Sequence, residues 1–113
     1  MTTLRTRVLE LNDRNFESAT AHGLVLVFFW EQWESGCRRE WKLINEAGEV
    51  VGEQVRIGRC SVEDYPELAE RLAVRSIPTT IIFRDGKEEE RLVGLRHERT
   101  LIKHLRKHLE KEA

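Results

Sequence analysis

The longest apolar stretch of the chain is LVLVFFW, from Leu24, which is rich in β-branched and aromatic residues. A near-continuous apolar run of this length predicts a strand buried on both faces. Further along the chain, apolar residues recur at spacings of three and four, which predicts a helix from about Ser35 toward Val51 with one apolar stripe. The stripe consists of Cys37, Trp41, Ile44, Ala47 and Val51. Together the two patterns predict a buried strand that leads into an amphipathic helix.

Four further segments have the pattern of strands. RVLEL near Val8 alternates between apolar and polar residues, and VRIGRCSV is rich in β-branched residues. TTIIF and EERLVGL lie on either side of Asp85-Gly86, a pair that is a strong hairpin signal between apolar runs. The last two strands are therefore expected to pair antiparallel.

Three more segments are typical of helices. A short helix is expected in NDRNFESATAH, with Asn12 or Asp13 as N-cap and Gly23 as its stop. YPELAERLA has Pro66 in its first turn, where the missing N–H does no harm. After His97, a poor N-cap, leucines at 101, 105 and 109 follow helical spacing.

Strands that alternate with helices predict an α/β fold of order βαβαβαββα. The expected architecture is a central mixed sheet of about five strands, flanked by helices on both faces. A length of 113 residues fits a single domain over residues 1–113. A content of 40% hydrophobic and 35% charged residues fits a small globule with a charged surface.

The charge balance argues against some classes of partner. Lysine and arginine number 19 against 20 acidic residues, a net charge of −1, so no overall field would attract nucleic acid or an anionic membrane. The start, MTTLRTRVLEL, lacks the apolar region of a signal peptide, and the apolar run is far below the roughly 20 residues of a spanning helix. With only two cysteines, we expect a cytoplasmic protein without disulfides. We expect no cofactor, and the sequence does not determine the oligomeric state.

Four segments of the chain, in register over nearly its whole length, resemble the thioredoxin family. VLVFFWEQWESGC is similar to the strand and turn that carry the family's W-C-G-P-C site. RSIPTTIIF is similar to the segment with the family's cis-proline, here Pro78, and FRDGKEEERLVGL to the hairpin that ends in the groove glycine, here Gly94. VEDYPELAERLAVRSIP is similar to the linker and third helix. The resemblance implies the thioredoxin fold.

The sequence departs from the family at the active-site motif, where WESGC stands in place of WCGPC. The resemblance implies that the family's nucleophilic cysteine corresponds to Glu34 and its resolving cysteine to Cys37. The acidic residue that the family carries in the preceding strand corresponds to Phe28, and the proline of the second helix to Lys42. Two groups that serve the same reaction in the family are therefore replaced.

Dithiol–disulfide exchange needs two sulfurs, one to attack and one to release the substrate. A carboxylate at Glu34 gains a similar stabilisation from the helix dipole, about 0.3–1 kcal/mol, but does not attack disulfides. We therefore expect exchange activity to be absent. The alternative is a monothiol oxidoreductase or redox sensor in cell redox homeostasis that uses Cys37, next to Arg38 and Arg39. Cys37 is otherwise a small apolar residue under the first turn of the helix.

The resemblance implies that the substrate groove of the family is retained. Its counterparts here are Trp33, Ile77, Pro78 and Gly94, with Glu34 at its edge. Main-chain pairing beside the proline needs no particular partner sequence, and tryptophan is enriched among binding hot spots. The leading hypothesis is a protein-binding or assembly module of chaperone type that holds a protein or an extended peptide segment. A third reading is a structural domain whose partner surface lies elsewhere, such as the charged second helix.

The remaining chemistry-bearing residues suggest structural roles. Cys60 is expected to face the layer opposite Cys37 and to fill the core. Arg59 has lost the expected acid at position 28, which leaves Glu31, Glu34 and Glu40 as candidate partners. His104 and His108 have the i, i+4 spacing of a metal pair, but no ligand follows nearby in the sequence, so we expect no metal site and a solvated helix face. The run from Glu88 to Glu90 is expected to be solvated as well.

Overall fold

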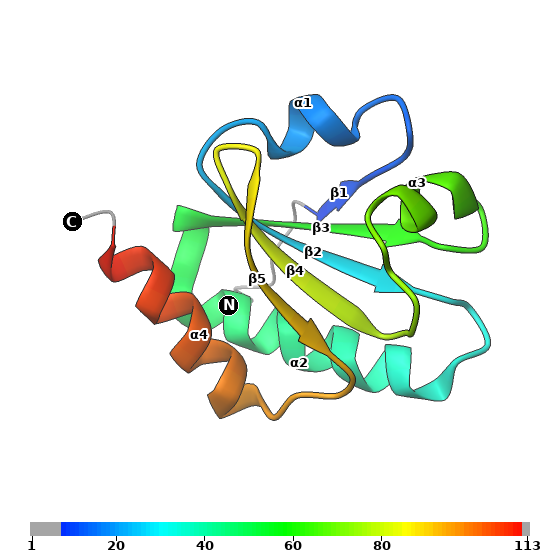
Figure 1. Cartoon of the computed structure of the whole chain (residues 1–113). Coiled ribbons are helices and arrows are strands. Elements are labelled where there is room, and N and C mark those ends of the chain that lie inside the picture. The colour runs from blue at the N-terminus through cyan, green and yellow to red at the C-terminus, as the bar shows by residue number, and fades with distance from the viewer. Residues whose placement is uncertain (1–7, 112–113) are drawn as a thin grey trace.

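The computed structural model describes residues 8–111, and its elements follow the expected order (Figure 1). The strands are β1 (Val8–Glu10), β2 (Leu24–Trp30), β3 (Val55–Ser61), β4 (Thr79–Arg84) and β5 (Lys87–Val93). The helices are α1 (Phe16–Thr20), α2 (Ser35–Val51), α3 (Pro66–Arg71) and α4 (Glu98–Glu110), with a short 3-10 helix, η1 (Gly52–Gln54), after α2.

The strands form one mixed sheet in the order β1-β3-β2-β4-β5. β3 pairs parallel with both β1 and β2, whereas β4 pairs antiparallel with β2 and β5. Helices α2 and α4 cover one face of the sheet, and α1 and α3 lie on the other (Figure 1). The predicted five-stranded mixed sheet with helices on both faces is confirmed.

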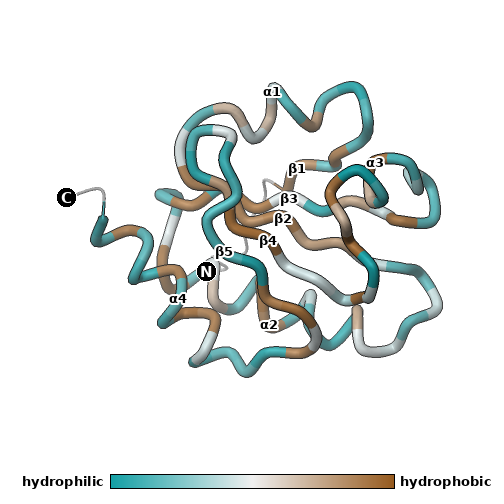
Figure 2. The backbone as a smooth tube through the Cα atoms, viewed as in Figure 1, coloured by the Kyte–Doolittle hydropathy of each residue, from teal (hydrophilic) through white to brown (hydrophobic). Residues whose placement is uncertain are grey.

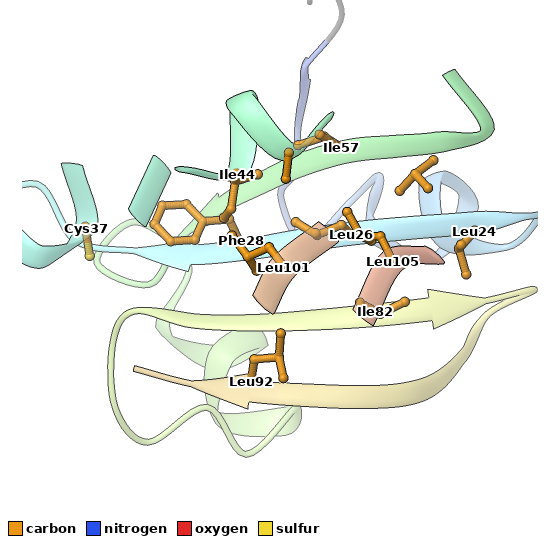
Figure 3. Packing of buried hydrophobic residues seen from close by; sticks show 12 residues of the cluster. Leu24, Leu26, Phe28, Cys37, Ile44, Ile57, Ile82, Leu92, Leu101 and Leu105 are labelled. Carbon is orange, nitrogen blue, oxygen red and sulfur yellow. The ribbon is translucent and has the colours of Figure 1, made fainter. Parts of the chain in front are cut away.

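The core lies on both sides of β2, as its continuous apolar sequence predicts. Leu24 through Phe29 are all buried, and alternate side chains enter different hydrophobic clusters because successive strand residues face opposite ways. Leu26 and Phe28 join the cluster under α2 and α4 (Figure 3), and Val27 and Phe29 join the cluster under α1 and α3. Hydrophobic residues accordingly follow the central strands in Figure 2.

The turn between β4 and β5 has the geometry that its sequence predicts. Asp85 and Gly86 both adopt positive φ angles, 52° and 87°, as two-residue hairpin turns require. The Asp85 carboxylate also accepts the N–H of Gly23 at 2.7 Å, which ties this turn to the start of β2. The strand register shifts once, between Ile82 and Phe83.

The first helix begins later than expected. Its N-cap is Asn15 rather than Asn12 or Asp13. The Asn12 carboxamide oxygen instead accepts the N–H groups of Arg14 and Asn15, at 2.8 and 2.9 Å. Asparagine favours such local turns as much as helix caps, and here the turn precedes the helix.

The expectation of solvated glutamates on β5 holds for Glu88 and Glu89, which are exposed, and is wrong for Glu90, whose side chain is 17% exposed. Glu89 and Glu90 both pair with His108, with Glu89 Oε1 3.1 Å from Nδ1 and Glu90 Oε1 2.7 Å from Nε2. Glu88 instead forms an ion pair with Arg91, with 2.8 Å between Glu88 Oε1 and Arg91 Nη2. Neighbouring strand residues normally face opposite ways, but the register shift lets Glu89 and Glu90 both reach α4.

The expectation of a solvated face at His104 and His108 is also wrong. His108 is only 2% exposed, and His104 Nδ1 lies 2.5 Å from Glu90 Oε2 without hydrogen-bond geometry. Arg84 completes the group, since its Nε bonds Glu89 at 3.1 Å and its guanidinium also reaches the His108 carbonyl. We name these five residues, Arg84, Glu89, Glu90, His104 and His108, the β5–α4 clasp.

Two kinds of feature are absent from the described part of the chain. No group of three or more His, Cys, Asp or Glu side chains within residues 8–111 is arranged to hold a metal ion. None of the helices described is long and apolar enough to cross a membrane.

Candidate functional site

The turn after β2 places Glu34 at the start of α2. Glu34 is the N-cap residue of that helix, and its Oε1 accepts the N–H of Gly36 at 2.8 Å. The Glu34 carbonyl accepts the N–H of Cys37 at 2.9 Å, which begins the helical ladder. A carboxylate there meets unpaired N–H groups and the positive end of the helix dipole. Glu34, which the resemblance places at the position of the attacking sulfur, is thus the capping acid of α2.

Cys37 lies one turn into α2 and faces the core. It is a free thiol, 3% exposed, at the edge of the cluster near the end of β2 (Figure 3). Burial raises the pKa of the Cys37 thiol, as do the negative charges of Glu34, Glu31 and Glu40, against the opposing hydrogen bond from the Glu31 N–H. The neutral thiol is therefore favoured over the reactive thiolate.

Aromatic rings fill the layer beneath Cys37. Phe28 stacks on Trp41 with ring centroids 5.5 Å apart. The Arg59 guanidinium lies 5.1 Å from the Trp41 ring centroid and 5.7 Å from that of Trp30. Together with Cys37 and Glu31 these residues line a cavity of about 100 Å³. Position 28 in β2 carries an aromatic ring that stacks on Trp41 instead of a carboxylate.

The expected partners of Arg59 were wrong. Its guanidinium pairs with Glu10 of β1, at 2.7 Å from Nε and from Nη2 to the same oxygen. β1 and β3 run side by side with Glu10 opposite Arg59, so the pair lies across one rung of the sheet. The Arg59 guanidinium thus pairs with an acid of the neighbouring strand and lies over two aromatic rings. It does not pair with Glu31, Glu34 or Glu40.

The two cysteines lie on opposite faces of the sheet. Cys37 belongs to the cluster under α2 and α4, and Cys60 to the cluster under α1 and α3. Burial raises the pKa of Cys60 to about 11, with a smaller effect of Asp13 and Asp64. The expectation that Cys60 faces the other layer and fills the core is confirmed. It cannot serve Cys37 as a second sulfur without crossing the sheet.

The start of β4 brings three of the expected groove residues together. The peptide bond between Ile77 and Pro78 is cis, and the Pro78 carbonyl accepts the N–H of Gly94 at 2.8 Å. Gly94 has a φ of 89°, and no atom lies within 4 Å of where a Cβ would stand. No hydrogen bond joins the N–H or carbonyl of Ile77 to any other residue in the range 8–111. These main-chain groups are free to pair with an incoming strand.

Three exposed apolar side chains lie just before α2 and at the end of β5. Trp33 is 69% exposed, Val93 49% and Leu95 45%. Val93 pairs with Thr79, next to Pro78, and Leu95 reaches the first turn of α2, where a Cβ at Gly36 would stand 3.5 Å from its Cδ2. A fourth exposed hydrophobic residue, Val50, lies at the far end of α2. We keep the name groove for the expected binding residues Trp33, Ile77, Pro78 and Gly94 together with Val93 and Leu95. Of these, Pro78 is buried and Ile77 is half-buried.

A buried acid near the groove escaped the sequence reasoning except as a candidate partner of Arg59. Glu40 is 0% exposed, and its Oε1 accepts the N–H of Arg96 at 2.8 Å. Burial raises the pKa of Glu40, against the Arg96 N–H bond and the Arg96 charge. Its position three residues after Cys37 and four before Ile44, on the apolar stripe of α2, is the signal that could have found it.

Comparisons with known proteins agree on one family. The family model for thioredoxin matches residues 7–107. The chain is 40% identical over 94 residues to a thioredoxin of Chlamydia caviae, covering 83% of this chain and 91% of that protein. It is 35% identical over 102 residues to a thioredoxin of Listeria monocytogenes, covering 90% and 99%. A mutant thioredoxin from Halobacterium salinarum has the same fold, with a TM-score of 0.79 at 23% identity over 92% of both chains.

Proposed function

The chain belongs to the thioredoxin family, and on that premise we propose that it binds other proteins through the groove without exchanging disulfides. The partner would be an extended segment of another protein, and the chain would act as an assembly or chaperone module. Neither nucleic acid nor a membrane is proposed as a partner. The observation that carries the proposal is Glu34, a capping acid at the position of the attacking sulfur.

The state of the remaining thiols supports the absence of exchange. Exchange requires an accessible thiolate and a second sulfur to resolve the mixed disulfide. Cys37 is buried with a raised pKa, and Cys60 lies in the opposite cluster. Phe28 and Trp41 stack where the family has its acid. These features support a protein without the dithiol cycle.

The groove supports the binding half of the proposal. The free main-chain groups of Ile77 can add a strand of any sequence. Trp33 offers a large exposed apolar side chain, of the type that dominates binding energies. Gly94 leaves room for a backbone to approach, because nothing stands within 4 Å of its missing Cβ.

The state of Cys37 argues against the monothiol alternative. A redox-active monothiol needs a lowered pKa and access to solvent, whereas Cys37 has neither. Mass spectrometry of the folded protein after treatment with glutathione disulfide tests this directly. We expect no adduct on Cys37; a stoichiometric adduct would favour the alternative.

A cytoplasmic location is part of the proposal. Both cysteines are free thiols, which a reducing compartment maintains.

The binding half is tested by titrating the protein with reduced, carboxymethylated α-lactalbumin, an unfolded chain without free thiols. We expect Trp33→Ala to weaken binding about tenfold, or about 1.4 kcal/mol. Val50→Ala is the matched control, since Val50 is also an exposed hydrophobic residue but lies at the other end of α2. Equal effects of the two substitutions, or no binding by the wild type, would refute the groove as the binding surface.

A further inference from the structure

Glu40 is unusual among the residues of the core because it is a carboxyl group with no exposed surface. One oxygen, Oε1, accepts the Arg96 N–H at 2.8 Å. The other, Oε2, has no hydrogen-bond partner among residues 8–111 and is itself buried. Burying a carboxyl group with only partial hydrogen bonding costs stability. Packing alone therefore favours an apolar residue at this position of the α2 stripe.

Glu40 connects α2 to the segment between β5 and α4 through its hydrogen bond with Arg96. This segment is held at two successive points, since the Gly94 N–H bonds the Pro78 carbonyl at 2.8 Å and the Arg96 N–H bonds Glu40. Leu95 stands between the two anchors. The first anchor fixes the segment to β4, and the second fixes it to α2.

The two anchors hold the main chain on either side of Leu95. Its Cδ2 faces Gly36 in the first turn of α2, 3.5 Å from where a Cβ would stand. That turn also carries Glu34 and directly follows Trp33. Leu95 is 45% exposed, so it offers apolar surface next to the first turn of α2 instead of filling the core.

We propose that Glu40 is a positioning residue that holds Leu95 as an apolar wall of the groove. A groove with this wall fits an extended partner segment that has an apolar side chain facing Leu95. This inference rests on the proposed function and adds the chemistry of the partner to it. The main chain of Ile77 pairs with the segment without regard to its sequence, and Leu95 together with Trp33 and Val93 selects for apolar side chains. A preformed wall lowers the ordering cost of binding.

The first test needs no ligand. Glu40→Met keeps a side chain of similar length but removes both acceptor oxygens, and Glu40→Gln keeps an acceptor. Amide hydrogen exchange, measured by NMR, should be at least about tenfold faster at Arg96 in Glu40→Met than in the wild type, with protection restored in Glu40→Gln. Unchanged exchange at Arg96 in Glu40→Met would overturn the positioning role.

The second test measures binding of reduced, carboxymethylated α-lactalbumin. We expect Leu95→Ser to weaken binding about fivefold and Glu40→Met about threefold, with Glu40→Gln close to the wild type. Val50→Ser is the control for the loss of an exposed apolar side chain. Circular dichroism and urea unfolding establish that each variant is folded, and Leu95→Ser, at a half-exposed position, tests the wall independently of the buried site.

The outcomes separate this inference from the proposed function. Binding that Trp33→Ala weakens but that Leu95→Ser and Glu40→Met leave unchanged would overturn the wall while leaving groove binding intact. Binding that falls in Leu95→Ser and Glu40→Met, with rescue in Glu40→Gln, supports both. No binding by the wild type would overturn both.

Discussion

β5 begins in the β5–α4 clasp and ends in the groove, and the two regions differ in how their groups are satisfied. In the clasp, each charged side chain has a partner, and His108 is bonded through both ring nitrogens. In the groove, apolar side chains are exposed and the main chain of Ile77 is unpaired within residues 8–111. The clasp joins β5 to α4 through ion pairs, whereas the groove residues Trp33, Val93 and Leu95 expose apolar surface. Stability and binding should therefore depend on different residues of one strand and its neighbours.

The largest effect on stability is expected in the clasp. His108→Ala leaves the carboxylates of Glu89 and Glu90 without their buried partner, so we expect the free energy of unfolding to fall by about 3 kcal/mol. Urea denaturation measures this. Lys107→Ala is the control, because Lys107 is an exposed neighbour 3.5 Å from Glu90, and its loss should change stability by less than about 0.5 kcal/mol. A loss below about 1 kcal/mol in His108→Ala would mean that the clasp is not structural.

Acid should weaken the same region. The hydrogen bond from Arg84 lowers the pKa of Glu89. Burial raises the pKa of Glu90, but the His108 bond and the charges of His104 and Lys107 outweigh it, so that pKa is also lowered. Carboxylates with lowered pKa stabilise the fold above the ordinary glutamate value of about 4.3, and this contribution is lost as the pH falls through their folded values. The urea midpoint should therefore drop steeply below about pH 4, and less steeply in Glu89→Gln.

Glu40 should show the opposite dependence. Its raised pKa means that the folded protein takes up a proton at a higher pH than the unfolded chain does. Lowering the pH from about 7 toward 5 therefore relieves the cost of the buried charge and stabilises the fold relative to Glu40→Gln. Urea midpoints of the two proteins at both pH values measure the difference. If the variant and the wild type respond equally to pH in this range, the pKa of Glu40 is not raised in the fold, contrary to this prediction.

The smallest effect on stability is expected in the groove. Trp33 is mostly exposed, so Trp33→Ala should change the free energy of unfolding by no more than about 0.5 kcal/mol. The same substitution is expected to weaken binding strongly, which distinguishes the groove from the clasp. A large loss of stability would show that Trp33 supports the fold, contrary to the division of roles between the two regions.

The sequence predicts the elements well where one local pattern decides them. The apolar run from Leu24 predicts the central strand, and Asp85-Gly86 predicts the hairpin, because both signals depend on neighbouring residues only. The first helix is a miss of the same local kind, since Asn12 could form a turn or a cap. The resemblance to the family, more than periodicity, indicated which residues meet in the groove.

Contacts between distant residues could not be predicted. Arg59 pairs with Glu10, 49 residues away, and His108 with Glu90, 18 residues away; many glutamates were available to each. The pairing of His108 also depends on a register shift in β5 that no residue pattern announces. Glu40 was visible in the sequence as an acid on an apolar stripe, but its partner is a main-chain N–H, which carries no side-chain signal.

The central claim is that this fold binds a partner but does not exchange disulfides. Its second half is tested most directly by following insulin disulfide reduction with dithiothreitol as the reductant. Glu34→Cys, which restores a second sulfur beside Cys37, serves as the comparison. We expect the wild type to add nothing to the rate with dithiothreitol alone and Glu34→Cys to raise that rate measurably. Wild-type turnover that Cys37→Ser abolishes would contradict the account.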